Sequence, residues 1–345
     1  MKEIVLMDFI GDKFSSMESN DIYKVKISLM MLGFEMKVTI NDQQELIEEY
    51  DIPIKSIDYK GIGEIVNLTD LEVILFEEHL NIEEIAELKG LKKLKINGHN
   101  LKDITFLKDL KELETLWIPK KRENDVWIDI SVLENLKNLT NLDISCVKVI
   151  GSECLNQLSD LEVLGIMDIG INNLRCIESL QKLKTLKLAY NEELNDLAGL
   201  EKLSLLNTLG LNGIGPKAKF DEVGQLVNLV GLELSCNKSY VDIAPLKNLK
   251  QLEKLSLGLS KVKNFEYIKE LSALKELRME TVKTVKDFTA IGELSHLETL
   301  VLRKNRQLTD ISFLAPLKNL KHLEIYECGK IEDYSAVEHV EKVVK

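Results

Sequence analysis

Cysteine and histidine, the side chains best able to bind a metal or attack a substrate, are scattered through the 345 residues. Metal ligands and a nucleophile with its general base both need close partners. No C-x-x-C pair occurs, and we find no motif for phosphate binding, serine hydrolysis or zinc proteolysis. The sequence therefore predicts no enzyme, no metal and no cofactor. The one catalytic alternative is a thiol site at Cys146 or Cys236, although neither has a histidine nearby as a base.

Aspartate followed by an apolar residue recurs along the chain. A carboxylate at the start of a helical turn accepts hydrogen bonds from free backbone N–H groups. Calcium binding would require a second carboxylate at a fixed offset, and none recurs. We therefore expect capping aspartates at Asp103, Asp129, Asp196, Asp242, Asp287, Asp310 and Asp333.

A repeat positions these aspartates. The spacing L-x-x-L-x-L begins at Leu91, and its steps are 22 or 23 residues with one of 26. The alternating leucines predict a short strand, and the apolar residues after them predict a short helical turn. One unit cannot bury its own apolar side, so the units must stack and their strands must form a parallel sheet. The spacing returns at Leu113, Leu139, Leu161, Leu183, Leu206, Leu229, Leu252, Leu274, Leu297 and Leu320.

The ninth position of the repeat is mixed. It holds asparagine at Asn191, Asn237 and Asn305, but an apolar residue at Ile214 and Val282. An apolar side chain cannot bond the backbone of the turn, so we expect water or neighbouring backbone to do so. His79 and His99 take this position in adjacent repeats, either as ordinary substitutes for asparagine or as a pH-sensitive or metal-binding pair.

The full pattern, L-x-x-L-x-L-x-x-N-x-L-x-D-I-x-x-L-x-x-L, is clearest in residues 229–249 and 297–317. It resembles the short 22-residue class of leucine-rich repeats, found in bacterial internalins and in regulatory subunits of protein phosphatase-1. The resemblance implies an α/β solenoid, a leucine-rich repeat horseshoe with a parallel concave sheet and short helical or 3-10 turns on the convex side. It also implies protein binding through the concave face. The alternative is an internalin-like secreted or surface adhesin exported without a visible signal peptide.

Residues 1–51 do not follow the period. Residues 3–10 and 22–40 are expected to form strands, and residues 41–50 a short helix with an Asn or Asp cap. We predict that residues 1–51 form a small strand-rich module, either a cap for the first repeat or a domain with its own partner. Residues 52–345 are predicted to form the solenoid, with about 12 or 13 repeats.

Alternation along the strands assigns the concave face to positions 3, 5, 7 and 8 of the repeat. Trp117 lies in the middle of this face, and an exposed tryptophan is typical of interface hot spots. Its alternative role is to lie over Lys95 and Asp143 as a shield. Trp127 ends a charged insertion and either lies at a binding edge or packs as local core. The predicted partner-binding residues are Trp117, Met167, Tyr190, Lys187, Arg278, Arg303, Tyr326 and Trp127.

Two further features of this face bear on its partner. Arg278, Arg303, Lys304 and Tyr326 form a patch suited to an acidic or phosphorylated partner, unless the neighbouring glutamates neutralise it. Glycines at 165, 210 and 258 leave the middle of the face without side chains, which would let a partner's backbone approach. The alternative is that Lys187 and Glu233 lie across this gap.

The charge balance limits the partners. Forty-five basic residues stand against 57 acidic ones, for a net charge of -12, which disfavours nucleic acid and anionic membranes. No apolar stretch approaches the ~20 residues of a membrane-spanning helix, and the first residues lack the basic start of a signal peptide. We expect a cytoplasmic protein that binds another protein, not a nucleic acid, a membrane or a small-molecule substrate.

Overall fold

The computed structural model describes residues 2–13, 17, 19–30, 34–42, 44–76, 78–98, 101, 103–119, 127–145, 148–237 and 240–345. It divides into two compact units, Met1–Ile169 (unit 1) and Gly170–Lys345 (unit 2). Loop residues of the insertion before Trp127, together with His99 and Cys146, lie outside the described residues.

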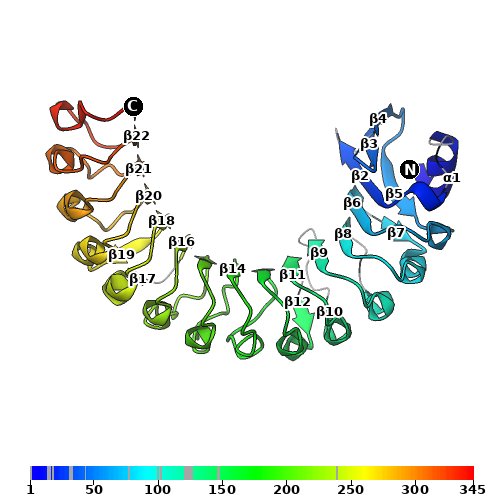
Figure 1. Cartoon of the computed structure of the whole chain (residues 1–345). Helices are drawn as coiled ribbons and strands as arrows, with labels where there is room; N and C mark the ends of the chain where they lie inside the picture. Colours follow the sequence, from blue (N-terminus) through cyan, green and yellow to red (C-terminus); the bar gives the residue numbers. More distant parts are fainter. Residues whose placement is uncertain are drawn as a thin grey trace. The chain divides into compact units, whose positions relative to one another are not determined.

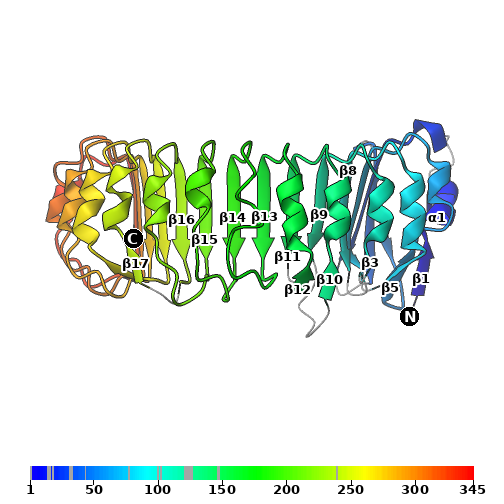
Figure 2. The same ribbon diagram turned by 90° about the horizontal axis from the view of Figure 1, so that it is seen from below.

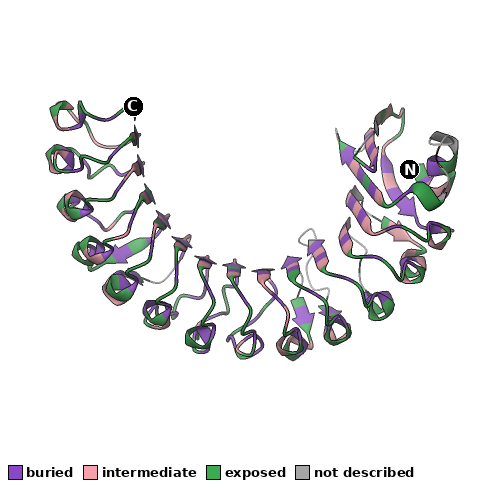
Figure 3. Ribbon diagram, in the orientation of Figure 1, coloured by how far each residue is buried: buried purple, intermediate pink, exposed green. Residues whose placement is uncertain are grey.

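The repeat folds as its apolar spacing predicts. In β18 (Lys254–Gly258), Leu255 and Leu257 point into the core and are at most 1% exposed, while the residues between them face outward. A 3-10 turn, η11 (Phe265–Glu270), then buries Phe265 and Ile268 against the same core. In Figure 3 buried residues recur along the strands and along the turns of the repeats. Burial of about 25 cal/mol per Å² of apolar surface, repeated in each neighbour contact, holds the stack together.

In unit 1 the main sheet has the order β13-β11-β9-β8-β6-β2-β3-β4. The repeat strands pair in parallel, whereas β2, β3 and β4 pair as antiparallel hairpins. The strands are β2 (Lys24–Met30), β3 (Glu35–Ile40), β4 (Gln44–Glu49), β6 (Asp70–Phe76), β8 (Lys93–Gly98), β9 (Thr115–Pro119), β11 (Asn141–Ser145) and β13 (Val163–Met167). Smaller parallel ladders join β1 (Lys2–Val5), β5 (Ile54–Asp58) and β7 (Glu78–Leu80), and β10 (Trp127–Asp129) with β12 (Lys148–Ile150).

In unit 2 the main sheet is parallel throughout, in the order β23-β22-β21-β20-β18-β16-β15-β14. Its other strands are β14 (Thr185–Ala189), β15 (Thr208–Asn212), β16 (Gly231–Ser235), β20 (Glu276–Glu280), β21 (Thr299–Arg303), β22 (His322–Tyr326) and β23 (Lys342–Val344). A separate ladder pairs β17 (Tyr240–Asp242) with β19 (Lys261–Lys263).

Short 3-10 turns cover the side of each sheet opposite its solvent-facing surface, as Figure 1 and Figure 2 show. In unit 1 these are η3 (Ile62–Glu64), η4 (Ile82–Glu87), η5 (Thr105–Asp109), η6 (Ser131–Asn135) and η7 (Ser152–Gln157); η1 (Ser19–Asp21) precedes β2. In unit 2 they are η8 (Leu200–Lys202), η9 (Glu222–Gln225), η10 (Ala244–Asn248), η11, η12 (Thr289–Glu293), η13 (Ser312–Leu314) and η14 (Ser335–Val337). The predicted leucine-rich repeat solenoid, with a parallel sheet and 3-10 turns, is confirmed.

The repeated aspartates hold these turns as predicted. Each accepts a hydrogen bond from the backbone N–H two residues later; the bond from Thr105 N to Asp103 Oδ1 is 2.8 Å and that from Ser335 N to Asp333 Oδ1 is 2.8 Å. The same bond is made by Asp129, Asp196, Asp242, Asp287 and Asp310. Six of the seven aspartates lie one residue before the N-cap residue of their turn, and Asp196 lies three residues before Gly199, so none is the N-cap residue itself. The motif is an Asx turn that leads into the 3-10 turn.

Two expectations for the first 50 residues are wrong. The strand expected over residues 3–10 ends at Val5, and α1 (Leu6–Lys13) follows, because Leu6, Phe9 and Ile10 are buried at helical spacing. The helix expected over residues 41–50 is the strand β4, paired with β3. The strands expected within residues 22–40 are confirmed as β2 and β3.

Asn41 explains the second error. Asn41 and Asp42 have φ values of 52° and 57°, the left-handed conformation of a hairpin turn and not that of a helix start. The buried Asn41 side chain accepts bonds from Tyr23 N and Lys24 N, both at 3.0 Å, and donates to Asp21 O. The residue predicted to cap a helix therefore ties a hairpin to the segment before β2.

Within the described ranges, no helix has the length and apolar character needed to cross a membrane.

Candidate functional site

The solvent-facing surface of the main sheet in unit 1 carries a row of side chains that touch across strands. Lys26, Glu72, Lys95, Trp117 and Asp143 are register partners on β2, β6, β8, β9 and β11. Their outward direction follows from the burial of the residues on either side of each in its strand. We call these five residues the Trp117 row.

One carboxylate in this row lies within ion-pair distance of three lysines. Glu72 lies 3.4 Å from Lys26 and 3.8 Å from each of Lys93 and Lys95, and its side chain is 13% exposed. The lysines are more exposed than the glutamate, so their charges remain accessible to a partner. Lys26 comes from the segment that lacks the repeat period, and no sequence spacing placed it here.

Trp117 lies between Lys95 and Asp143 in the register of the sheet. The Lys95 ammonium lies 5.8 Å from the centre of the Trp117 ring, within range of a cation–π interaction. On the other side Asp143 accepts a 2.8 Å bond from Ser145 Oγ. Trp117 is partly exposed, so it lies against Lys95, as the shielding hypothesis expected, and still presents indole surface to solvent.

Asp143 also fills the gap that Gly165 was predicted to leave. A Cβ added at Gly165 would lie 2.6 Å from Asp143 Oδ2, so this carboxylate already occupies the space over the glycine. Met167 ends β13 and is partly exposed beside Ser145, its register partner.

Trp127 belongs to a different ladder. It opens β10, pairs with Lys148 of β12, and its ring centre lies 5.7 Å from the Lys148 ammonium. The next residue, Ile128, is buried, whereas Trp127 is 55% exposed. The alternative that Trp127 packs as local core is therefore wrong, and the structure does not bring Trp127 and Trp117 together in one strand ladder.

In unit 2 the predicted cationic patch is neutralised. Arg278 Nε contacts Glu276 at 2.5 Å, Arg303 Nε contacts Glu324 at 2.5 Å, and Lys304 lies 3.4 Å from Glu280. The hydrogen bond from Arg303 lowers the pKa of Glu324. Tyr326 is 48% exposed beside Arg303. These contacts support mutual neutralisation over a site for a phosphorylated partner.

Lys187 and Tyr190 lie at the start of the unit 2 sheet. Lys187 is exposed on β14 beside Gly210. Tyr190 follows β14 with φ of 54°, is 51% exposed, and donates its backbone N–H to Asn212 O at 2.7 Å. Glu233 does not close the glycine gap here, because Glu233 Oε1 accepts bonds from Asn212 and Ser235 instead. Lys187 lies closer, since its Cγ is the atom nearest to a Cβ placed at Gly210, at 3.8 Å.

The gap opens as a groove of about 320 Å³ on the sheet surface of unit 2. We call it the Gly210 groove; its floor includes Gly210 and Gly231, and its rim includes Lys187, Glu233, Lys254 and Ser256.

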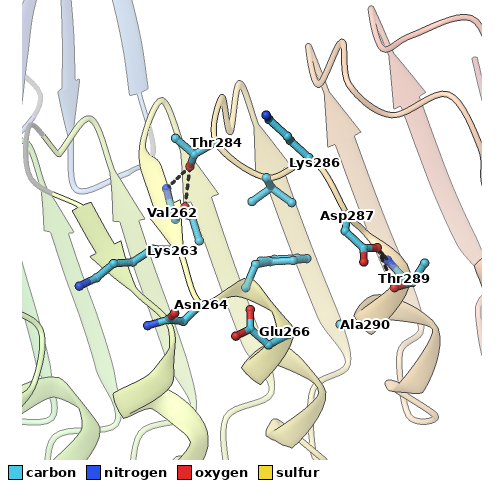
Figure 4. A pocket seen from close by; sticks show the side chains of 11 residues that line it. Val262, Lys263, Asn264, Glu266, Thr284, Lys286, Asp287, Thr289 and Ala290 are labelled. Atoms are coloured by element: carbon cyan, nitrogen blue, oxygen red, sulfur yellow. Dashed lines mark hydrogen bonds between the residues drawn. The ribbon is translucent and has the colours of Figure 1, made fainter.

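A second depression lies on the turn side of unit 2 (Figure 4). It has a volume of about 370 Å³ between η11 and η12. Two of its polar side chains are already engaged: Thr284 Oγ1 accepts from Val262 N at 2.7 Å and donates to Val262 O, and Asp287 accepts from Thr289. A depression of about 300 Å³ occurs between η4 and η5 of unit 1, where Asp103 and Thr105 take the same places. The depression therefore recurs between neighbouring turns and arises from the packing of the repeats, which does not indicate a binding site.

The four described cysteines are buried or partly buried. Cys154 and Cys176 are buried, and Cys236 and Cys328 are partly buried. Burial raises the pKa of the Cys328 thiol, which makes it a poorer nucleophile at neutral pH. In the described part of the chain, no group of three or more His, Cys, Asp or Glu side chains could hold a metal ion.

Known proteins share this architecture. A family model described as leucine rich repeats (2 copies) matches residues 295–339. The structural match to the internalin inlF of Listeria monocytogenes covers 98% of this chain and 94% of the inlF chain, with 20% sequence identity and a TM-score of 0.67. The chain has the fold of a leucine-rich repeat solenoid.

Two further similarities concern the partners of leucine-rich repeat proteins. A "Putative adenylate cyclase regulatory protein" of Trypanosoma equiperdum is 29% identical over 250 residues, which are 65% of this chain and 37% of that protein. The chain thus spans well under half of that relative. The TLR13–ssRNA13 complex has a TM-score of 0.53 and 20% identity over 80% of this chain and 47% of that chain. A protein with this fold thus binds RNA, so the exclusion of nucleic acid depends on charge alone and stays a prediction.

The asparagines at the ninth position bond the backbone of the preceding repeat. Asn237 Oδ1 accepts from Ile214 N at 3.1 Å, and Asn305 Oδ1 accepts from Val282 N at 2.9 Å. An asparagine at position 214 or 282 would bond the repeat before it in the same way, so the expectation that water or neighbouring backbone replaces those bonds stays a prediction.

His79 replaces this asparagine in unit 1 and is also fully engaged. Its Nδ1 lies 2.8 Å from the hydroxyl of the buried Tyr59, and its Nε2 lies 3.2 Å from Asn97 O. A neutral ring protonated on Nε2 satisfies both contacts. Burial lowers the pKa of His79 from 6.5 to about 4. His79 is thus an ordinary substitute for asparagine among the described residues.

Acidification is expected to weaken the fold through His79. In the unfolded chain His79 is protonated below about pH 6.5, whereas in the folded chain it stays neutral down to about pH 4. The free energy of unfolding therefore falls as the pH falls through this range, and the loss is about 2 kcal/mol at about pH 5. Urea unfolding of the wild type and His79→Asn at neutral and mildly acidic pH measures this. Equal losses in both proteins would show that His79 does not carry the effect.

Proposed function

We propose that this leucine-rich repeat protein is a non-enzymatic protein-binding module, and that the Trp117 row is its principal contact surface. The observation that carries the proposal is the arrangement of Trp117, held against Lys95 and beside Asp143, on an open sheet surface. A tryptophan that already lies against a neighbouring side chain loses less conformational entropy when a partner covers it than a free one would. This preorganisation is what a binding hot spot requires.

The charges around Trp117 support the same proposal. Glu72 and its three lysines form a polar border on one side of the ring, and Asp143 forms one on the other. Interface hot spots are typically apolar centres within a polar rim that excludes water. The comparisons support the fold that presents this surface. The cytoplasmic location stays a prediction, which fractionation of the native cells would test.

Trp117→Ala is expected to weaken partner binding by about 2 kcal/mol or more, roughly thirtyfold, because it removes the apolar centre of the surface. The measurement is capture from native lysate followed by quantitative mass spectrometry. Trp127→Ala is the matched control, because it removes the other exposed tryptophan from a separate ladder. A partner captured equally by wild type and Trp117→Ala, and lost with Trp127→Ala, would place the contact on the β10 ladder instead.

A further inference from the structure

The Gly210 groove of unit 2 combines an open floor with charged side chains of both signs, including two lysines that make no ion pair with a described residue. By register, Lys187 lies beside Gly210, and Lys254 lies beside Gly231. Both lysines are exposed. Among the described residues neither lies within ion-pair distance of a carboxylate, whereas Arg278, Arg303 and Lys304 on the same sheet all do.

The two carboxylates that line the groove, Glu233 and Glu276, are held by other groups. Glu276, the register partner of Lys254, contacts Arg278. Glu233 Oε1 accepts from Asn212 Nδ2 at 3.0 Å and from Ser235 Oγ at 3.2 Å. Asn212 is itself fixed, since its Oδ1 accepts from Ser235 N and Ser235 Oγ. These bonds hold the Glu233 oxygen beside the last residues of β15 and β16, while Lys187 and Lys254 border the glycines.

The packing of the chain does not require glycine at position 210 or 231 in the groove floor. Neither Gly210 nor Gly231 has a positive φ, so the backbone does not require glycine at either place. A Cβ added at Gly210 would lie 3.8 Å from its nearest neighbour, and one at Gly231 would lie 3.7 Å from its own, both ordinary contacts. At Gly165 in unit 1, by contrast, Asp143 fills the corresponding space.

We propose that the Gly210 groove seats an extended acidic segment of the protein partner, whose backbone crosses the glycines and whose carboxylates pair with Lys187 and Lys254. This inference rests on the proposed protein-binding function and names the chemistry of the partner. Acidic segments are attracted by unpaired cations on a partly enclosed surface, and the glycine floor lets the segment's backbone approach the sheet. The chain as a whole has a net charge of -12 and so repels an acidic segment, which favours its binding at the two lysines over the rest of the surface.

Selection of short peptides from a random phage-displayed library tests the chemistry before the partner is known. Wild-type protein is expected to enrich peptides rich in aspartate and glutamate. The double variant Lys187→Glu and Lys254→Glu is expected to lose this preference and to bind the selected peptides at least about tenfold more weakly. The matched control is Lys217→Glu with Lys318→Glu, which makes the same charge change at exposed turn residues.

Gly210→Leu tests the groove itself. The branched side chain fills the floor without a backbone clash, so acidic peptides are expected to bind about tenfold more weakly while the melting temperature is kept. Peptides with no acidic preference, or unchanged binding in both variants, would overturn the proposal. Binding of oligouridylate alone, lost in the double lysine variant, would also overturn it and point to RNA. Loss of the native partner with Trp117→Ala but not with these variants would reject the groove and leave the proposed function standing.

Discussion

Asn305→Ala is expected to reduce the free energy of unfolding by about 2 to 5 kcal/mol, because it leaves two buried backbone groups without a partner. Asn305 is fully buried, accepts from Val282 N at 2.9 Å and donates to Met279 O at 2.9 Å. Water cannot reach these groups without opening the interface between two repeats. Urea denaturation followed by circular dichroism measures the loss.

The matched control for Asn305 is Asn319→Ala. Asn319 donates to Ser295 O at 2.8 Å from an exposed position, where water can replace it, so the expected loss is about 0.5 kcal/mol or less. Similar losses in both variants would show that the buried asparagine does not carry the stabilising role assigned to it.

Alanine is expected to have opposite effects at two glycines of unit 2. At Gly224, in η9, an added Cβ would lie 2.4 Å from Pro245 O of η10, so the repeats must separate, and we expect destabilisation of about 1 to 3 kcal/mol. At Gly231, in β16, the Cβ meets only an ordinary contact, and the gain in chain stiffness is expected to stabilise by about 0.5 kcal/mol.

Thermal and urea unfolding of the two glycine variants side by side measure this difference. The comparison separates a glycine required by repeat packing from one that the fold does not require. Destabilisation of both by the same amount would contradict the account of the Gly210 groove, because the fold itself would then need its open floor.

The sequence predicted the parts of the fold that repeat. Leucine spacing located the strands, and Asp103 and its counterparts located the turns, because both patterns arise from contacts made once in every repeat. The errors lie where the period stops. Asn41 and Asp42 have the composition of a helix cap, but their positive φ values belong to a hairpin turn, which only the pairing of β3 with β4 determines.

The candidate site was only partly predictable. Trp117 and its neighbours Lys95 and Asp143 follow from alternation along strands of known period. Lys26 reaches the same row through the parallel pairing of β2 with β6, which no spacing in the sequence encodes. The difference between the paired Arg278 and the unpaired Lys187 depends on side-chain positions, which composition does not determine. The roles of the predicted binding residues in partner recognition stay predictions.

Site-specific photo-crosslinking tests most directly the claim that the sheet surface binds a protein. A photoreactive residue is placed at Asn141, exposed on β11 beside the Trp117 row, or at Glu134, exposed on the turn η6 of the neighbouring repeat. In native lysate the account predicts a protein crosslink from position 141 that Trp117→Ala removes, and none from position 134. A crosslink from position 134 alone would contradict it and place the binding surface on the turns.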